Sequence, residues 1–200
     1  MAESPIDKNR DDDVALDKKL DDLYELIDGI EVAMFTTRRA DGRLVSRPMQ
    51  TVRRAAGADL WFVTDIETHK LTELIADMHV NVSYYRDRTR EWVSVSGTAA
   101  VSDDRETVRK LYSPTWRAWF PDQGGERNGG PDDPRIALIL VTADSVTYMK
   151  ADRPAPAVLF EVAKAVVTRS APRVGEQREL NEQELRIAQH RDIAEPEARA

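Results

Sequence analysis

The sequence predicts a mainly β (α+β) fold with flanking helices, in which about six strands form an antiparallel barrel. About six segments of β-prone residues are separated by turns rich in Gly, Asp, Pro and Thr, and few segments have helical periodicity. Short antiparallel strands leave unpaired edges unless the sheet closes on itself. A barrel is therefore the simplest arrangement.

Composition excludes several classes of protein. The chain has 29 basic and 36 acidic residues, and its net charge of −7 favours solubility and argues against a general nucleic-acid surface. Its longest apolar runs, such as Ile136 to Val141, are far shorter than the roughly 20 residues of a membrane-spanning helix. Residues 1–17 lack the apolar segment of a secretory signal. We therefore expect a cytoplasmic protein with no membrane or nucleic-acid partner.

The chain begins with an acidic arm and a helix. Residues 1–17 include Asp11-Asp12-Asp13 and little apolar material, which is typical of a flexible segment. An amphipathic helix is then predicted, with Gly29 placed to end it, because apolar residues recur at helical spacing at Leu16, Leu20, Leu23, Leu26 and Ile27.

Strand signals dominate the middle of the chain, at residues 31–37, 43–54, 60–64, 80–85, 92–97 and 136–149. Asp41-Gly42 joins the first two as a hairpin, and residues 55–59 form the next turn. A short helix is predicted from Lys70 to Met78, with Thr68 able to cap it, and Asp103 can cap a second helix.

Three segments make up the predicted domain organisation: a flexible acidic arm at 1–17, a barrel domain at 18–150 and a helical C-terminal extension at 151–200. Within the extension, helices are predicted around 157–168 and 181–191, with a linker at 170–175. Residues 121–134 form a loop rich in Gly, Pro and Asp.

The segment from Thr64 to Lys70 is a candidate phosphate site. It lies where a strand ends and a helix begins, so unsatisfied helix amides, the hydroxyls of Thr64 and Thr68, and the cations of His69 and Lys70 can converge on an anion. The alternative is that Thr68 only caps the helix and Lys70 is a solvated surface residue.

A second candidate is Ser46-Arg47-Pro48-Met49 in the second strand. Pro48 lacks an N–H, so it belongs at an edge or a bulge, where a planar ligand can lie against the strand. Arg47 can offer a charged fork to a phosphate or to a ring. An ordinary edge strand with a surface arginine is the alternative.

Other chemistry has less support. Trp116 is typical of a core or interface anchor, whereas Trp92, Trp119 and Phe120 can also stack on a ring. The chain has no cysteine and only three scattered histidines, which gives no metal signature. The fingerprints of P-loop, dinucleotide-binding and serine-hydrolase sites are missing as well.

Taken in order, four motifs resemble the pyridoxamine 5′-phosphate oxidase-like FMN-binding split barrels, and in particular the general stress protein 26 branch. They are Ser46-Arg47-Pro48-Met49, Leu60-Trp61-Phe62-Val63-Thr64, Thr68-His69-Lys70 and Val93-Ser94-Val95-Ser96-Gly97. The segment Ala118-Trp119-Phe120-Pro121 is similar to that branch too, and the resemblance covers roughly Leu20 to Met149.

This resemblance implies a six-stranded split barrel that forms a homodimer, with FMN sites in the clefts between subunits. Arg47 and Lys70 would hold the FMN phosphate, with Thr68 and His69 beside them. The flavin ring and ribityl chain would be lined by Met49, Gln50, Val63 and Thr64. Trp92, supplied by the other subunit, would close the ring pocket, and no residue is assigned a catalytic role.

Two departures from the family narrow the expected function. The lysine that true pyridoxamine phosphate oxidases carry after the strand arginine is Val52 here, and no Arg-x-His follows Tyr148-Met149-Lys150. A phosphorylated substrate would lack these counter-charges. We therefore expect an FMN-dependent oxidoreductase that is not a pyridoxamine phosphate oxidase. A protein that stores FMN or senses redox state, or a barrel using deazaflavin or haem, remains as the alternative.

Overall fold

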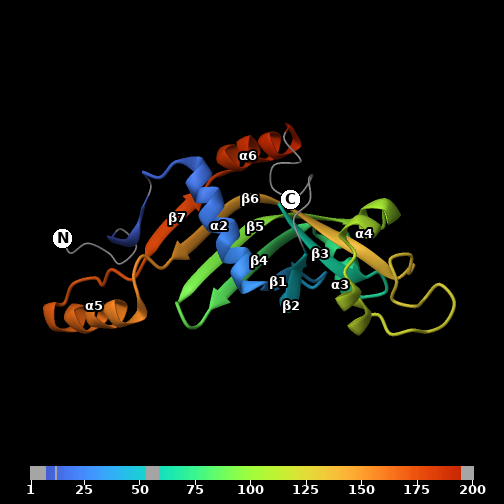
Figure 1. Ribbon diagram of the computed structural model, residues 1–200, viewed down its shortest axis with the longest axis horizontal. Helices are drawn as coiled ribbons and strands as arrows, with labels where there is room; N and C mark the ends of the chain where they lie inside the picture. The colour runs from blue at the N-terminus through green and yellow to red at the C-terminus, as the bar shows by residue number, and fades with distance from the viewer. Residues whose placement is uncertain (1–7, 12, 53–58, 195–200) are drawn as a thin grey trace.

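The computed structural model describes residues 8–11, 13–52 and 59–194. The barrel strands are β1 (Val32–Arg38), β2 (Leu44–Val52), β3 (Leu60–Asp65), β4 (His79–Arg86), β5 (Glu91–Ser102) and β6 (Ile136–Lys150). They are antiparallel in the order β3-β2-β1-β4-β5-β6, and the barrel closes where β3 pairs with β6 (Figure 1). The predicted fold class is confirmed. The predicted turn at 55–59 and the end of the second strand at Arg54 fall mostly outside the described residues.

Helices flank the barrel, namely α2 (Leu16–Ile30), α3 (His69–Ala76), α4 (Arg105–Leu111), α5 (Ala155–Thr168) and α6 (Glu182–Ala194). The buried face of α2 packs into the main core, as its apolar spacing predicted. The helix ends one residue after Gly29, and Glu31, which follows it, has a positive φ of 65°. Within the described ranges, no helix has the length and apolar content needed to cross a membrane.

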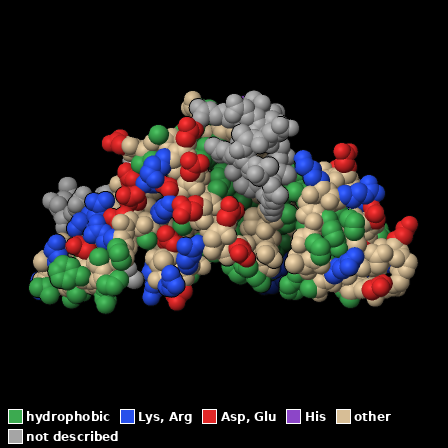
Figure 2. Space-filling model, viewed as in Figure 1, with side chains coloured by type: hydrophobic (Ala, Val, Ile, Leu, Met, Phe, Trp, Pro, Cys, Tyr) green, Lys and Arg blue, Asp and Glu red, His purple; other side chains and the backbone are tan. Residues whose placement is uncertain are grey.

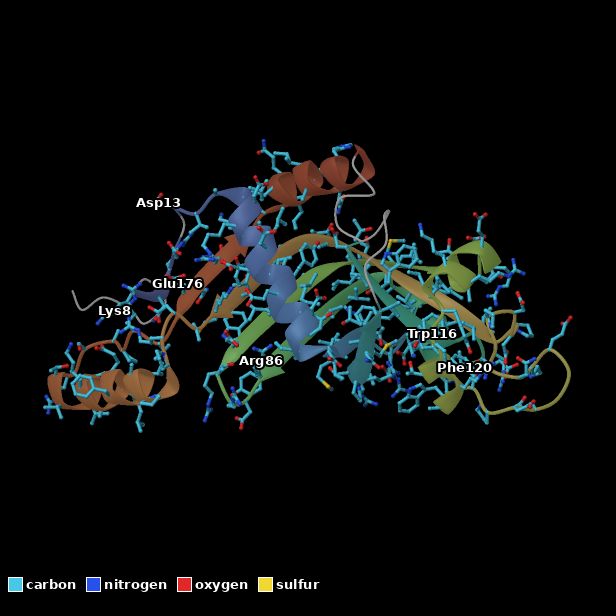
Figure 3. All side chains as sticks on the ribbon, in the orientation of Figure 1. Lys8, Asp13, Arg86, Trp116, Phe120 and Glu176 are labelled. Atoms are coloured by element: carbon cyan, nitrogen blue, oxygen red, sulfur yellow. The ribbon has the colours of Figure 1, made fainter. Side chains whose placement is uncertain are left out.

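A second, smaller core lies outside β3 and the first half of β6, beneath α4 and the short helix η1 (Pro114–Ala118). Trp116 and Phe120 lie together in it (Figure 3), and Phe120 is too buried to stack on a ligand, whereas Trp119 is 77% exposed. The predicted helix cap was one residue too early, because the Asp104 carboxylate accepts a hydrogen bond from the Thr107 amide at 2.9 Å.

One strand was not predicted, β7 (Glu176–Leu180), which pairs with the last part of β6. Its sequence has little alternation, and its buried Arg178 is held by ion pairs with Asp11, Asp22 and Glu176. Residues 8–11 lie beside this segment, and the Lys8 ammonium donates to the Ala171 carbonyl at 2.6 Å (Figure 3). The strand therefore depends on contacts distant in sequence, which local pattern does not reveal.

The bend in the barrel depends on Gly97. The register between β5 and β6 shifts here, since Ser96 pairs with Ser145 while Gly97 pairs with Ala143. A β-carbon on Gly97 would lie 2.0 Å from the Thr142 carbonyl oxygen. Only glycine allows so close an approach of the two backbones.

Replacing Gly97 by Ala should lower the free energy of unfolding by roughly 2–3 kcal/mol, because β6 must move away from its partner. Gly42→Ala is the matched control, since its β-carbon meets open space and only its φ of 83° is unfavourable. That variant should lose only about 1 kcal/mol. Urea unfolding measures both, and an equal loss in the two variants would contradict the steric explanation.

Candidate functional site

The turn between β3 and α3 presents an uncapped helix start. Thr68 occupies the N-cap position, but its hydroxyl donates to the Asp65 carbonyl at 2.8 Å and no side chain caps α3. The predicted capping role of Thr68 is therefore wrong. Because the amides of His69 and Lys70 lie in the first turn of an uncapped helix, they can serve an anion.

Lys70 points from this turn toward the end of β3. Its ammonium donates to the hydroxyl of the buried Thr64 at 2.9 Å. Burial lowers the pKa of Lys70, and the charge of Arg47 lowers it further, although Asp65 acts in the opposite direction. Among the described residues, no carboxylate lies within ion-pair distance of Lys70. This half-buried cation consequently lacks a direct counter-charge.

Arg47 completes a cluster of two cations. It pairs with Phe35 across β1 and β2, so its side chain lies on the inner face of the sheet. Its guanidinium contacts Glu73 of α3 through two nitrogens, each at 2.9 Å, and donates to Thr37 at 2.9 Å. The hydrogen bond from Arg47 holds the pKa of Glu73 below its usual value. Since Glu73 neutralises Arg47 alone, the cluster keeps one positive charge.

Sequence reasoning missed Glu73 and Thr37. Glu73 follows Lys70 by three residues, so helical spacing places both on one face of α3. That spacing was a usable signal for Glu73. Thr37 gave no signal, since its position beside Arg47 depends on the pairing of β1 with β2.

The other predicted site residues do not join this cluster. Met49 packs in the main core, and Val63 lies against the smaller core. His69 is exposed on the first turn of α3. Gln50 and Trp92 are on the outer face of the sheet, opposite to the face of Arg47, so a single chain keeps Trp92 apart from its own Arg47 and Lys70.

Two rows of paired residues across the middle of the outer face of five strands, β2, β1, β4, β5 and β6, contain no charged side chain, and the exposed Asp144 lies beside them at the bulge in β6. One row of paired residues is Pro48, Met34, Ser83, Ser94 and Thr147, and the next is Ser46, Thr36, Asn81, Ser96 and Ser145. Val32, Met34 and Tyr85 on this face are 45–53% exposed. A solvated sheet face normally carries charges, so this uncharged outer face has the character of an interface.

Comparison with known proteins identifies the family of this chain. The sequence pattern of the pyridoxamine 5′-phosphate oxidase-like family matches residues 18–173. Protein bli-3 of Neurospora crassa is 38% identical over 180 residues, covering 88% of this chain and 86% of that protein.

Two solved structures share the fold. The putative general stress protein 26 of Jannaschia is 25% identical, with a TM-score of 0.63 over 82% of this chain and 99% of that one. A pyridoxamine 5′-phosphate oxidase-related, FMN binding protein of Nostoc punctiforme has a TM-score of 0.50 at 16% identity, covering 69% of this chain and 85% of its own.

Proposed function

Because this chain belongs to the pyridoxamine 5′-phosphate oxidase-like family, we propose that it is a flavoprotein that binds FMN by its phosphate at Arg47, Thr64, Thr68 and Lys70. The observation that supports this is the half-buried Lys70 ammonium, which lies near the Arg47 guanidinium and forms no ion pair with a carboxylate in the described part of the chain. A phosphate would supply the missing negative charge and accept from the uncapped amides of α3.

The chemistry of this protein would be that of the flavin, which transfers hydride or electrons when bound. The chain's own residues bind and orient the cofactor, and none has to act as an acid or base. Bleaching of the FMN-loaded protein by NADH or NADPH would identify a reductase directly. If the flavin stays oxidised with both donors, the reductase proposal fails and FMN storage or redox sensing is favoured.

The active form would be a homodimer in which the uncharged outer faces meet. In such a pair, Gln50 and Trp92 of one copy can line the flavin ring bound by the other, since in their own chain they lie on the opposite face of the sheet from Arg47. Met49 packs in the core, so it would contact the cofactor only through its backbone. A monomer at micromolar concentration in sedimentation experiments would contradict this arrangement.

Pyridoxamine 5′-phosphate is not the expected substrate. Val52 stands where the related oxidases carry a lysine, so a substrate phosphate would lack that counter-charge. An oxidation assay with this compound checks the point, and rapid turnover would show that the assignment is wrong.

Comparing FMN with riboflavin tests the phosphate site itself. FMN should bind at micromolar concentration or below, and riboflavin at least 100-fold more weakly, because it lacks the group that two cations would hold. Quenching of flavin fluorescence on titration measures both affinities. Similar affinities would show that binding does not depend on the phosphate and would remove Arg47 and Lys70 from the site.

A further inference from the structure

Helix α5 carries an apolar stripe that faces away from its own chain. Figure 1 shows the helix projecting beyond the end of the barrel, and Figure 2 shows hydrophobic side chains gathered over it. The stripe consists of exposed residues at helical spacing: Leu159, Phe160, Ala163, Val166 and Val167. Its four large members are 67–84% exposed.

This pattern is the reverse of an ordinary surface helix, which turns its apolar side inward. Val158 and Ala165, on another side of α5, are half-buried, while the most apolar side faces solvent. No helix or strand of the described chain packs closely along α5. A contiguous exposed apolar stripe of this kind indicates a docking surface.

We propose that α5 is an arm that packs its apolar stripe onto a second copy of this chain, at the flank of the dimer described above, on which this inference rests. The arm begins five residues after β6, whose Thr147 and Met149 belong to the outer face of the sheet. It therefore starts at the border of the uncharged outer face. When two outer faces meet, each arm extends alongside the other copy.

The area of the α5 stripe is compatible with a contact between two copies of the chain. A helix of 14 residues is about 21 Å long and about 10 Å wide, so half of its surface is roughly 330 Å². In a two-fold dimer each copy gives one arm and receives one, which is roughly 660 Å² per copy. Stable interfaces bury about 800 Å² per partner, so the arms and the outer face together are sufficient.

The test is the dimer dissociation constant of the full chain, measured by sedimentation equilibrium with FMN present. Phe160→Glu/Val167→Glu should raise this constant at least tenfold, since two charges would be placed in the buried contact. Lys164→Glu is the matched control, with the same change of −2 in charge on the same helix, and should leave the constant nearly unchanged. Circular dichroism verifies that each variant folds.

A second measurement reports on the helix directly. The chain has no cysteine, so Val167→Cys provides one unique site for an environment-sensitive dye. The dye should become shielded from iodide quenching when the protein is concentrated from monomer to dimer.

Each result has a distinct meaning. A tight dimer with an unchanged constant in the double variant, or with a dye that stays exposed, would refute the arm and leave the dimer in place. A chain that is monomeric at every concentration would refute the dimer as well. Binding of wild type, but not the double variant, to phosphatidylserine vesicles without any change in dimer affinity would instead make α5 a membrane-surface helix.

Discussion

Replacing Lys70 by Met should weaken FMN binding about 10- to 150-fold and also raise the thermal stability of the FMN-free protein. A hydrogen bond to a charged group contributes about 1.5–3 kcal/mol, which gives the expected loss of affinity. Stability should change in the opposite direction because the Lys70 charge is half-buried beside Arg47 and unfavourable without a ligand. Fluorescence titration and thermal melts of one preparation measure both effects.

The pH dependence of stability is an independent measure of whether the Lys70 charge stabilises or destabilises the FMN-free protein. The pKa of Lys70 lies below its ordinary value of 10.5, so the unfolded chain binds more protons between the two values. The FMN-free protein should therefore gain stability as pH rises through the folded pKa toward 10.5. Lys70→Met lacks this group, so the stability difference between variant and wild type should shrink over the same interval.

Arg47→Ala provides the contrasting variant. It should also weaken FMN binding, but it should lower stability, because Glu73 would lose its ion-pair partner and keep only the hydroxyl of Thr37 among the hydrogen bonds that lower its pKa. Arg43→Ala removes a cation that is 79% exposed on the β1–β2 hairpin and should change neither property. If Lys70→Met destabilises the protein as much as Arg47→Ala does, Lys70 is a structural residue and the anion site is misplaced.

Local pattern was sufficient for most of the fold. Helix α2 and the six barrel strands have strong periodicity and marked turns, such as Asp41-Gly42, so neighbouring residues determine them. β7 has no such pattern, and its position depends on Arg178 reaching Asp22 on α2, more than 150 residues away in the chain. Contacts of that kind leave no signal in a short window of sequence.

The candidate site was predicted only in part, because contacts between distant segments assemble it. Arg47 and Lys70 were identified from separate motifs, and the pairing of β2 with β1 together with the packing of α3 brings them together. Glu73 was missed because its role depends on which face of α3 meets β1. The family resemblance assigned Trp92 to the other subunit but grouped Gln50 with Met49, Val63 and Thr64, whereas Gln50 lies on the outer face with Trp92, so that its proposed role also needs a partner subunit.

Replacing Asp133 by Asn should lower the free energy of unfolding by about 3 kcal/mol. Asp133 is fully buried, and its carboxylate accepts hydrogen bonds from the Gly129 and Arg135 amides and from the Arg135 guanidinium at 2.7–3.0 Å. Without that carboxylate the buried Arg135 cation loses its ion-pair partner and keeps neutral contacts such as the Pro121 carbonyl, which is the costly way to break an ion pair. Urea unfolding measures the loss.

The loss of stability caused by Asp133→Asn should depend on pH. Hydrogen bonds from Arg135 lower the pKa of Asp133 to about 2, from an ordinary value of 3.8. The stability contributed by Asp133 is therefore complete above pH 4 and is lost as pH falls toward 2. Over this interval the difference between wild type and Asp133→Asn should shrink. Asp132→Ala, whose side chain is 65% exposed, is the neighbouring control and should change little at any pH.

Loss of the Asp133 carboxylate should also disturb the cluster formed by Arg47 and Lys70. The Arg135 carbonyl accepts from the Ile66 amide at 2.8 Å, and Arg127 of the same loop contacts Glu67 at 2.9 Å, so the Asp133–Arg135 pair supports the turn before α3. Asp133→Asn should therefore weaken FMN binding and stability together, whereas Lys70→Met should weaken binding while raising stability. FMN affinity that is unchanged in Asp133→Asn would show that the turn keeps its geometry without the loop, and the cluster would then be organised by β3 and α3 alone.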